Sequence, residues 1–188
     1  LGYIGLPTAA IISNREILTF GIDINDDVVD TVNNGNIHIT EPGLKKIVQE
    51  SVESGFLKAY SQPKSSDVYI ITVPTPLKQG NLPDITYVED AIKNIAPVLD
   101  KNNVIIIEST CPVGTTEEVS YYIEKNTNID LEELFISYCP ERVLPGNILK
   151  ELIINDRVIG GLTSHSSIKA ENFYKTLTNN YIHQDLVD

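Results

Sequence analysis

The chain has 188 residues, a hydrophobic share of 41% and a formal net charge of −12. This size and composition suit a globular protein with one sizeable core, and the acidic balance excludes the basic face that a nucleic-acid-binding protein needs. The two cysteines lack zinc-site spacing, and no apolar run reaches the roughly 18 residues that a membrane span requires. We therefore expect a cytoplasmic α/β protein with no metal site and no nucleic-acid or membrane partner.

The chain opens on LGYIGLPTAA, and its glycines, Gly2 and Gly5, match the back half of the dinucleotide fingerprint G-x-G-x-x-G. In that fingerprint one glycine lets the backbone approach a pyrophosphate, and another lets the helix pack on the sheet. Two glycines three residues apart also occur by chance in ordinary loops. A chain that begins within the fingerprint, with no methionine anywhere, is expected to be clipped at its N-terminus.

The next predicted element is a short buried strand over 17–24, which ends in an acid, Asp23. About 20 residues after the glycine turn is where a dinucleotide fold needs a carboxylate for the adenosine ribose hydroxyls. The other interpretation is a helix-capping acid, since a helix is predicted over 26–33. No arginine follows directly, which favours NAD over NADP.

Strand and helix patterns then alternate along the rest of the chain. In chain order we predict a helix over 41–55, a strand over 67–74, a helix over 85–99, a strand over 103–110, a helix over 114–126, strands over 134–140 and 157–161, and a helix over about 164–177. This alternation predicts a Rossmann-like doubly wound α/β fold, with a mostly parallel sheet and helices on both faces.

Three predicted strand ends carry hydroxyl or acidic residues beside a proline. They are Thr72–Pro76, Glu108–Gly114 and Tyr138–Gly146. Ligands of open α/β sheets bind beyond the carboxyl ends of the strands, so these turns predict a binding cleft. Each alone would also suit an ordinary connection between a strand and a helix.

Together these segments resemble the UDP-glucose/GDP-mannose dehydrogenase family. The resemblance is carried by residues 2–9, 21–25, 72–76, 108–116, 139–146 and 155–161. Residues 36–43 and 84–89, together with the Arg142–Gly146 ending, are similar to the subgroup that acts on UDP-N-acetyl-D-mannosamine.

The resemblance implies a four-electron oxidation of the C6 alcohol of a nucleotide sugar to a carboxylate, with two NAD⁺ consumed and a cysteine thioester on the way. It implies an NAD-binding domain, a central helix that forms homodimers, and a nucleotide-sugar domain. Residues 1–188 resemble only the NAD-binding domain. The nucleophilic cysteine and the family's lysine are therefore expected outside this chain, which should be inactive alone.

The resemblance also implies roles for single residues. The pyrophosphate and the helix contact are expected along Gly2, Tyr3, Ile4 and Gly5, and the adenosine ribose at Asp23. The cofactor cleft is expected to be lined by Val73, Pro74 and Thr75, and the nicotinamide to lie near Ser109 and Thr110. Thr110 and Glu141 are expected to be catalytic, with Glu141 serving as a base or water-orienting group that also touches cofactor and substrate. Arg142, Val143 and Leu144 are expected to follow the sugar nucleotide, although Arg142 would also suit a surface ion pair.

Several alternatives remain open at this stage. The same chemistry would act on UDP-glucose, UDP-N-acetylglucosamine or GDP-mannose, because much of the sugar pocket is expected outside this chain. A different class is a non-catalytic NAD-binding module. Cys111 and Cys139 are interpreted as structural thiols, because neither has a nearby histidine or lysine in sequence.

Overall fold

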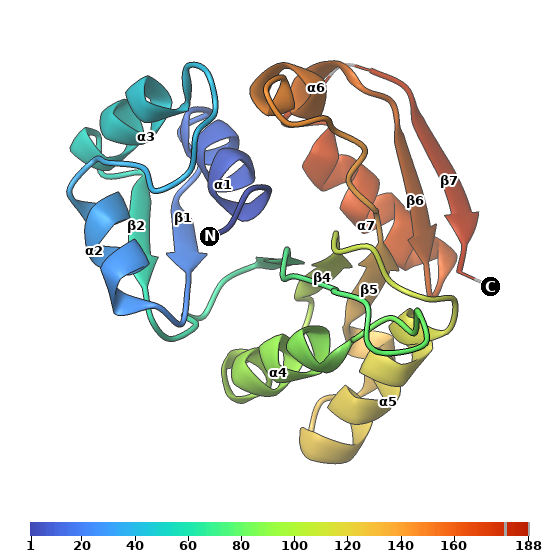
Figure 1. Cartoon of the computed structure of the whole chain (residues 1–188). Coiled ribbons are helices and arrows are strands. Elements are labelled where there is room, and N and C mark those ends of the chain that lie inside the picture. The colour runs from blue at the N-terminus through green and yellow to red at the C-terminus, as the bar shows by residue number, and fades with distance from the viewer. Residues whose placement is uncertain (179, 188) are drawn as a thin grey trace. The chain divides into compact units, whose positions relative to one another are not determined.

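The computed structural model describes residues 1–178 and 180–187, and the chain divides into two compact units (Figure 1). The first unit comprises Leu1–Pro63, Arg142–Asn155 and Thr176–Asn180, and the second comprises Lys64–Glu141, Asp156–Lys175 and Tyr181–Asp188. No helix in the described part of the chain combines the length and apolarity needed to cross a membrane.

The first unit is built on two parallel strands flanked by helices (Figure 1). Its elements are α1 (Gly5–Ser13), β1 (Thr19–Ile22), α2 (Asp26–Asn33), α3 (Leu44–Glu53), β2 (Leu57–Tyr60) and α6 (Ile148–Ile154). Every residue of α1 is buried, so this helix forms the centre of the unit. The Asn33 side chain ties α2 to β2, because it donates to the Ala59 carbonyl at 3.0 Å and accepts from the Ala59 amide at 2.8 Å.

The second unit holds a five-stranded sheet in the order β3-β4-β5-β6-β7. Its elements are β3 (Val68–Ile71), α4 (Thr86–Ile95), the 3₁₀ turn Ala96–Val98, β4 (Val104–Ile107), α5 (Thr115–Asn126), the 3₁₀ turn Leu131–Glu133, β5 (Phe135–Tyr138), β6 (Arg157–Gly161), α7 (Ser164–Tyr174) and β7 (Ile182–Leu186). Strands β3, β4 and β5 are parallel, β6 is antiparallel to β5, and β7 is parallel to β6.

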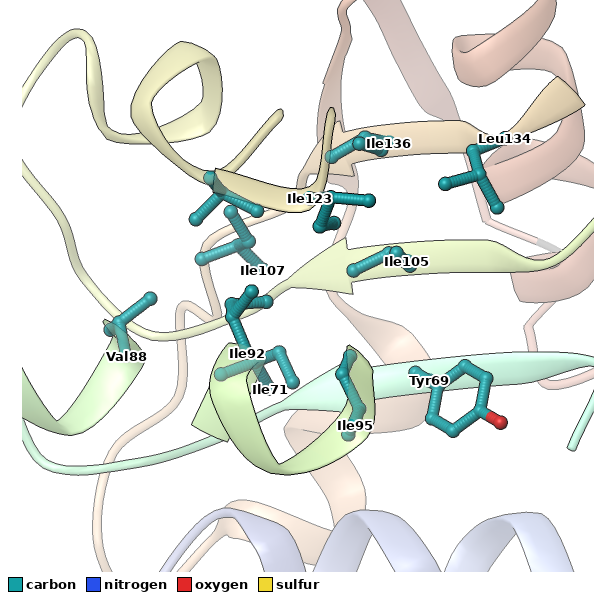
Figure 2. Packing of buried hydrophobic residues seen from close by; sticks show 11 residues of the cluster. Tyr69, Ile71, Val88, Ile92, Ile95, Ile105, Ile107, Ile123, Leu134 and Ile136 are labelled. Atoms are coloured by element: carbon teal, nitrogen blue, oxygen red, sulfur yellow. The ribbon is translucent and has the colours of Figure 1, made fainter. Parts of the chain in front are cut away.

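The main core lies between this sheet and two helices (Figure 2). Alternate residues of a strand share one face, so Ile105 and Ile107 of β4 face the same side. Ile92 of α4 and Ile123 of α5 pack against that side. The intervening residue Ile106 is also fully buried, on the opposite face, where α7 packs on the sheet. Helices thus cover both faces, which confirms the predicted Rossmann-like fold.

Gly161, the last residue of β6, is placed where no side chain fits. A Cβ there would lie 2.5 Å from the Ser167 amide nitrogen and 2.6 Å from the Thr163 carbonyl oxygen, so α7 begins directly against the strand. Gly160 differs, because the nearest atom to its Cβ would be the tip of the Val187 side chain, at 3.0 Å.

We expect Gly161→Ala to lower the free energy of unfolding by about 3 kcal/mol, because backbone atoms cannot rotate away from the added methyl group. Gly160→Ala is the matched control, since a flexible side chain can yield there, and it should cost clearly less. Urea unfolding of both variants followed by circular dichroism measures the difference. Equal losses would show that contact with α7 does not determine the cost.

Most predicted helices and strands are present with shorter bounds, and besides the 3₁₀ turn Leu131–Glu133 three were not predicted. The α2 helix begins and ends as expected, and the predicted strand over 157–161 is β6. The three helices and strands that the patterns did not indicate are β2, α6 and β7. The expectation of a mostly parallel sheet holds, with β5 and β6 as the antiparallel exception.

Candidate functional site

The glycine turn leads directly into α1. The Leu6 amide donates to the Gly2 carbonyl at 3.1 Å, and the Thr8 amide donates to the Ile4 carbonyl at 3.0 Å, so the helical pattern starts within the turn. The N-cap residue, Ile4, supplies no side-chain hydrogen bond to the helix start. A Cβ on Gly2 would meet no atom within 4 Å, so the backbone is open there. The first amides of a helix have no intrahelical acceptor and suit an anion.

Asp23 follows the last residue of β1 and is partly buried. Its carboxylate accepts a hydrogen bond from the Asn25 amide at 2.9 Å. Burial raises the pKa of Asp23, and the hydrogen bond from the Asn25 amide lowers it. The cap of α2 is Asn25, whose side chain accepts from the Asp27 amide at 3.0 Å. Asn25, and not Asp23, is therefore the residue that caps α2.

Ile24 is a feature that sequence reasoning missed. Its side chain is 84% exposed although it lies directly between the β1 acid and the α2 cap. An apolar side chain in this position is open to a ligand. The signal in the sequence was the apolar residue immediately after the strand-ending acid.

In the second unit, Ser109 joins the ends of β3 and β4. Its hydroxyl accepts from the Val73 amide at 2.8 Å and lies 2.8 Å from the Val73 carbonyl oxygen. Ser109 is buried, whereas Thr110 and Pro74 are exposed and Thr75 is partly exposed. The Ser109 hydroxyl therefore shapes the strand ends, and Thr110 is the exposed residue of the two.

The third predicted turn is divided between the units. Glu141 belongs to the second unit, where its amide donates to the Glu108 carbonyl at 3.3 Å. Arg142, Val143 and Leu144 belong to the first unit. Arg142 and Leu144 are exposed, and Val143 packs against the apolar cluster of Ile11, Ile148 and Leu152. The predicted pyrophosphate residues and Asp23 also lie in the first unit, whereas residues 73–75, 109 and 110 lie in the second.

A buried polar cluster of Glu108, Arg157, Tyr174 and Cys139 lies beneath these strand ends, and the sequence did not reveal it. Arg157 Nη1 is 2.9 Å from Glu108 Oε1, and the guanidinium carbon lies 4.1 Å from the centre of the Tyr174 ring. The Tyr174 hydroxyl donates to the same Glu108 oxygen at 3.3 Å. Glu108 is 0% exposed and Arg157 is 7% exposed, so the pair is shielded from water.

Burial controls ionisation in this cluster. It raises the pKa of Glu108 above its ordinary value, and the charge of Arg157 offsets only part of that effect. Burial also raises the pKa of Cys139 and that of Cys111 to about 11. A nucleophilic cysteine must be a thiolate, so both thiols are poor nucleophiles near neutral pH. This agrees with their interpretation as structural residues.

Comparison with known proteins shows which family the chain is similar to. Residues 1–178 match the NAD-binding domain of the UDP-glucose/GDP-mannose dehydrogenase family. The chain is 49% identical over 183 residues to the UDP-N-acetyl-D-mannosamine dehydrogenase of Escherichia coli K12, a match that covers 93% of this chain and 44% of that protein. It is 43% identical over 183 residues to an NDP-N-acetyl-D-galactosaminuronic acid dehydrogenase of Ralstonia solanacearum, covering 93% and 43%.

A solved structure gives the same result. The UDP-N-acetyl-mannosamine dehydrogenase of Staphylococcus aureus aligns with a TM-score of 0.95 and 40% identity, covering 99% of this chain and 46% of that one. The chain thus spans less than half the length of these relatives. The matched part is the portion that binds NAD, which confirms the cofactor prediction.

Proposed function

Because the chain belongs to the UDP-glucose/GDP-mannose dehydrogenase family, we propose that it supplies the NAD-binding part of an enzyme that oxidises the C6 alcohol of UDP-N-acetyl-D-mannosamine to the carboxylate. The observation that carries the proposal is the uncapped, open start of α1 in the same unit as the Asp23 carboxylate. The 49% identity to the E. coli enzyme supports this choice of sugar.

The residues present fit NAD. The free amides at the start of α1, from Gly2 to Gly5, would bind the pyrophosphate, and Asp23 would accept hydrogen bonds from the adenosine ribose hydroxyls. Ile24, with its exposed side chain, would contact the adenine. In the second unit, Val73, Pro74, Thr75, Ser109 and Thr110 are proposed to line the nicotinamide half.

NAD⁺, when bound, accepts the hydride from the sugar C6. The chain's own residues then position the reacting oxygen and move a proton. Thr110 is exposed, and its hydroxyl can hold the reacting oxygen or a water. Glu141 is proposed as the general base or water-orienting carboxylate during hydrolysis of the thioester, a role that a positioned carboxylate can fill.

The sugar and its diphosphate are proposed to lie along Arg142, Val143 and Leu144. The exposed Arg142 guanidinium offers a planar set of donors suited to phosphate oxygens. The cysteine nucleophile, the rest of the sugar site and a homodimer interface are proposed to belong to the full-length protein.

We expect Asp23→Ala to weaken NAD binding about 10–100-fold, because it removes charge-assisted hydrogen bonds to the ribose. Asp26→Ala is the matched control. It removes one negative charge, as Asp23→Ala does, but from an exposed acid in the first turn of α2. Calorimetric titration of each variant with NAD⁺ measures the change. Equal weakening in both variants would mean that Asp23 acts only through general electrostatics.

The proposed activity is tested on the full-length gene product. NADH formed per sugar consumed is measured with UDP-N-acetylmannosamine, UDP-N-acetylglucosamine, UDP-glucose and GDP-mannose in separate reactions. Two NADH per UDP-N-acetylmannosamine, with little from the others, is the expected result. Two NADH from a different sugar would keep the chemistry and replace the substrate. NAD⁺ binding with no NADH from any sugar would favour a non-catalytic NAD-binding module.

A further inference from the structure

A buried carboxylate in the first unit links two segments that lie far apart in the sequence. Glu41 is 5% exposed, and it accepts hydrogen bonds from the Gly146 amide at 2.9 Å and from the Ile148 amide at 2.8 Å. These amides follow Glu41 by 105 and 107 positions. A buried carboxylate is tolerated only where hydrogen bonds compensate for lost water, so these two contacts account for its burial.

The turn at Gly43 directs Glu41 toward these amides. Gly43 has a φ of +81°, a left-handed conformation that glycine adopts without steric cost. The turn closes as the Leu44 amide donates to the Glu41 carbonyl at 3.2 Å. A Cβ on Gly43 would lie 3.6 Å from the Leu149 side chain, so α6 packs against this turn. The Glu41 carboxylate is thereby held beside the segment that precedes α6.

That segment, residues 142–147, has its peptide groups held by side chains. The Leu144 amide donates to Glu151 Oε2 at 2.7 Å, and Asn155 Nδ2 donates to the Arg142 carbonyl at 2.6 Å. Glu151 and Asn155 lie in α6 or just after it, so their bonds fold the segment onto its own helix. Glu41 is different, because it ties the segment to the α3 turn.

We propose that Glu41 is a positioning residue that fixes segment 142–147 for the sugar nucleotide. This inference rests on the proposed function, in which Arg142 and Leu144 contact that substrate. Leu144 is 67% exposed and Arg142 is exposed, so the backbone is anchored while these side chains remain available. Without the carboxylate, the segment loses both hydrogen bonds to the α3 turn, so the substrate must supply more of its ordering.

The test compares Glu41→Ala and Glu41→Gln with Asn33→Ala in the full-length enzyme. Asn33 is a matched control, because its side chain also makes two hydrogen bonds to distant backbone in the same unit but none to segment 142–147. In Glu41→Ala we expect KM for the nucleotide sugar to rise about tenfold or more, with the NAD dissociation constant changed less than about twofold. Glu41→Gln should recover part of the loss, since its amide oxygen still accepts one bond.

Two outcomes would overturn the inference. One is an equal rise of the sugar KM in Glu41→Ala and Asn33→Ala. The other is a parallel loss of NAD and sugar binding, which would indicate general destabilisation.

A second readout separates this inference from the proposed function. Hydrogen exchange at the Gly146 and Ile148 amides should be accelerated in Glu41→Ala and unchanged in Asn33→Ala. If the wild-type enzyme forms no NADH with any sugar nucleotide, the proposed function fails, and calorimetric titration with UDP takes the place of KM. Unchanged exchange at both amides would overturn the positioning role whatever the activity.

Discussion

Arg157→Met should lower the free energy of unfolding by about 3–5 kcal/mol. Methionine keeps the apolar length of the side chain but removes the charge that faces Glu108 at 2.9 Å. The carboxyl, 0% exposed, would then be buried without its cation, and the contact with the Tyr174 ring would also be lost. Urea unfolding followed by circular dichroism measures the loss.

The matched control is the double variant Glu108→Leu with Arg157→Met. Replacing both members of a buried ion pair with apolar residues is often neutral or stabilising, so the double variant should recover most of the loss. A double variant as unstable as Arg157→Met would indicate that Arg157 acts through packing rather than through the charge on Glu108.

The loss of unfolding free energy in Arg157→Met should also depend on pH. The variant raises the pKa of Glu108 beyond the increase that burial already causes, so the folded state binds a proton more tightly than the unfolded state does. The variant therefore keeps its stability below about pH 4.3, the pKa of glutamate in an unfolded chain. Its stability falls as the pH rises toward the higher pKa of Glu108 in the folded state. Unfolding at pH 5 and pH 8 should show the larger destabilisation at pH 8. The opposite order would contradict the assignment to Glu108.

Glu141→Gln in the full-length enzyme should lower kcat by about 10²–10⁴-fold, the usual contribution of a positioned general base. Glutamine preserves the size of the side chain but cannot accept a proton. Because hydride transfer to NAD⁺ precedes hydrolysis in the proposed sequence, rapid mixing should still show an initial burst of NADH before the slow steady state.

Glu117→Gln is the control for this prediction. It removes an exposed acid from the first turn of α5, with the same change of charge and shape. Its kcat should equal that of the wild type. A kcat within about threefold of the wild type for Glu141→Gln would exclude this residue as the base, since even weak general-base catalysis contributes more than that.

Elements with strong local signals were predictable from the sequence. The α2 helix has an asparagine cap and acids in its first turn, and its bounds agree with the prediction. The missed strands lack such signals. In β2 only Leu57 and Ala59 are buried within four residues, and β7 is largely exposed. Alternation over so few residues is too weak to distinguish a strand from a loop.

The candidate site was predictable where its residues are near one another in the chain. The glycine turn and Asp23 belong to one turn-helix-strand pattern, which a single sequence carries. The Glu108–Arg157 pair joins residues 49 positions apart, and Glu41 reaches more than 100 positions along the chain. No local pattern encodes such partners, because tertiary packing brings them together.

The path of the chain constrains how this domain can be recombined with its relatives. Arg142–Asn155 belongs with Leu1–Pro63, although the residues on either side of it belong to the other unit. A chimera joined once, after Pro63, would separate Ile11 from Ile148 and Leu152 of α6. It would also separate Glu41 from the two backbone amides that donate hydrogen bonds to it. An exchange of this region between relatives should therefore move both segments together.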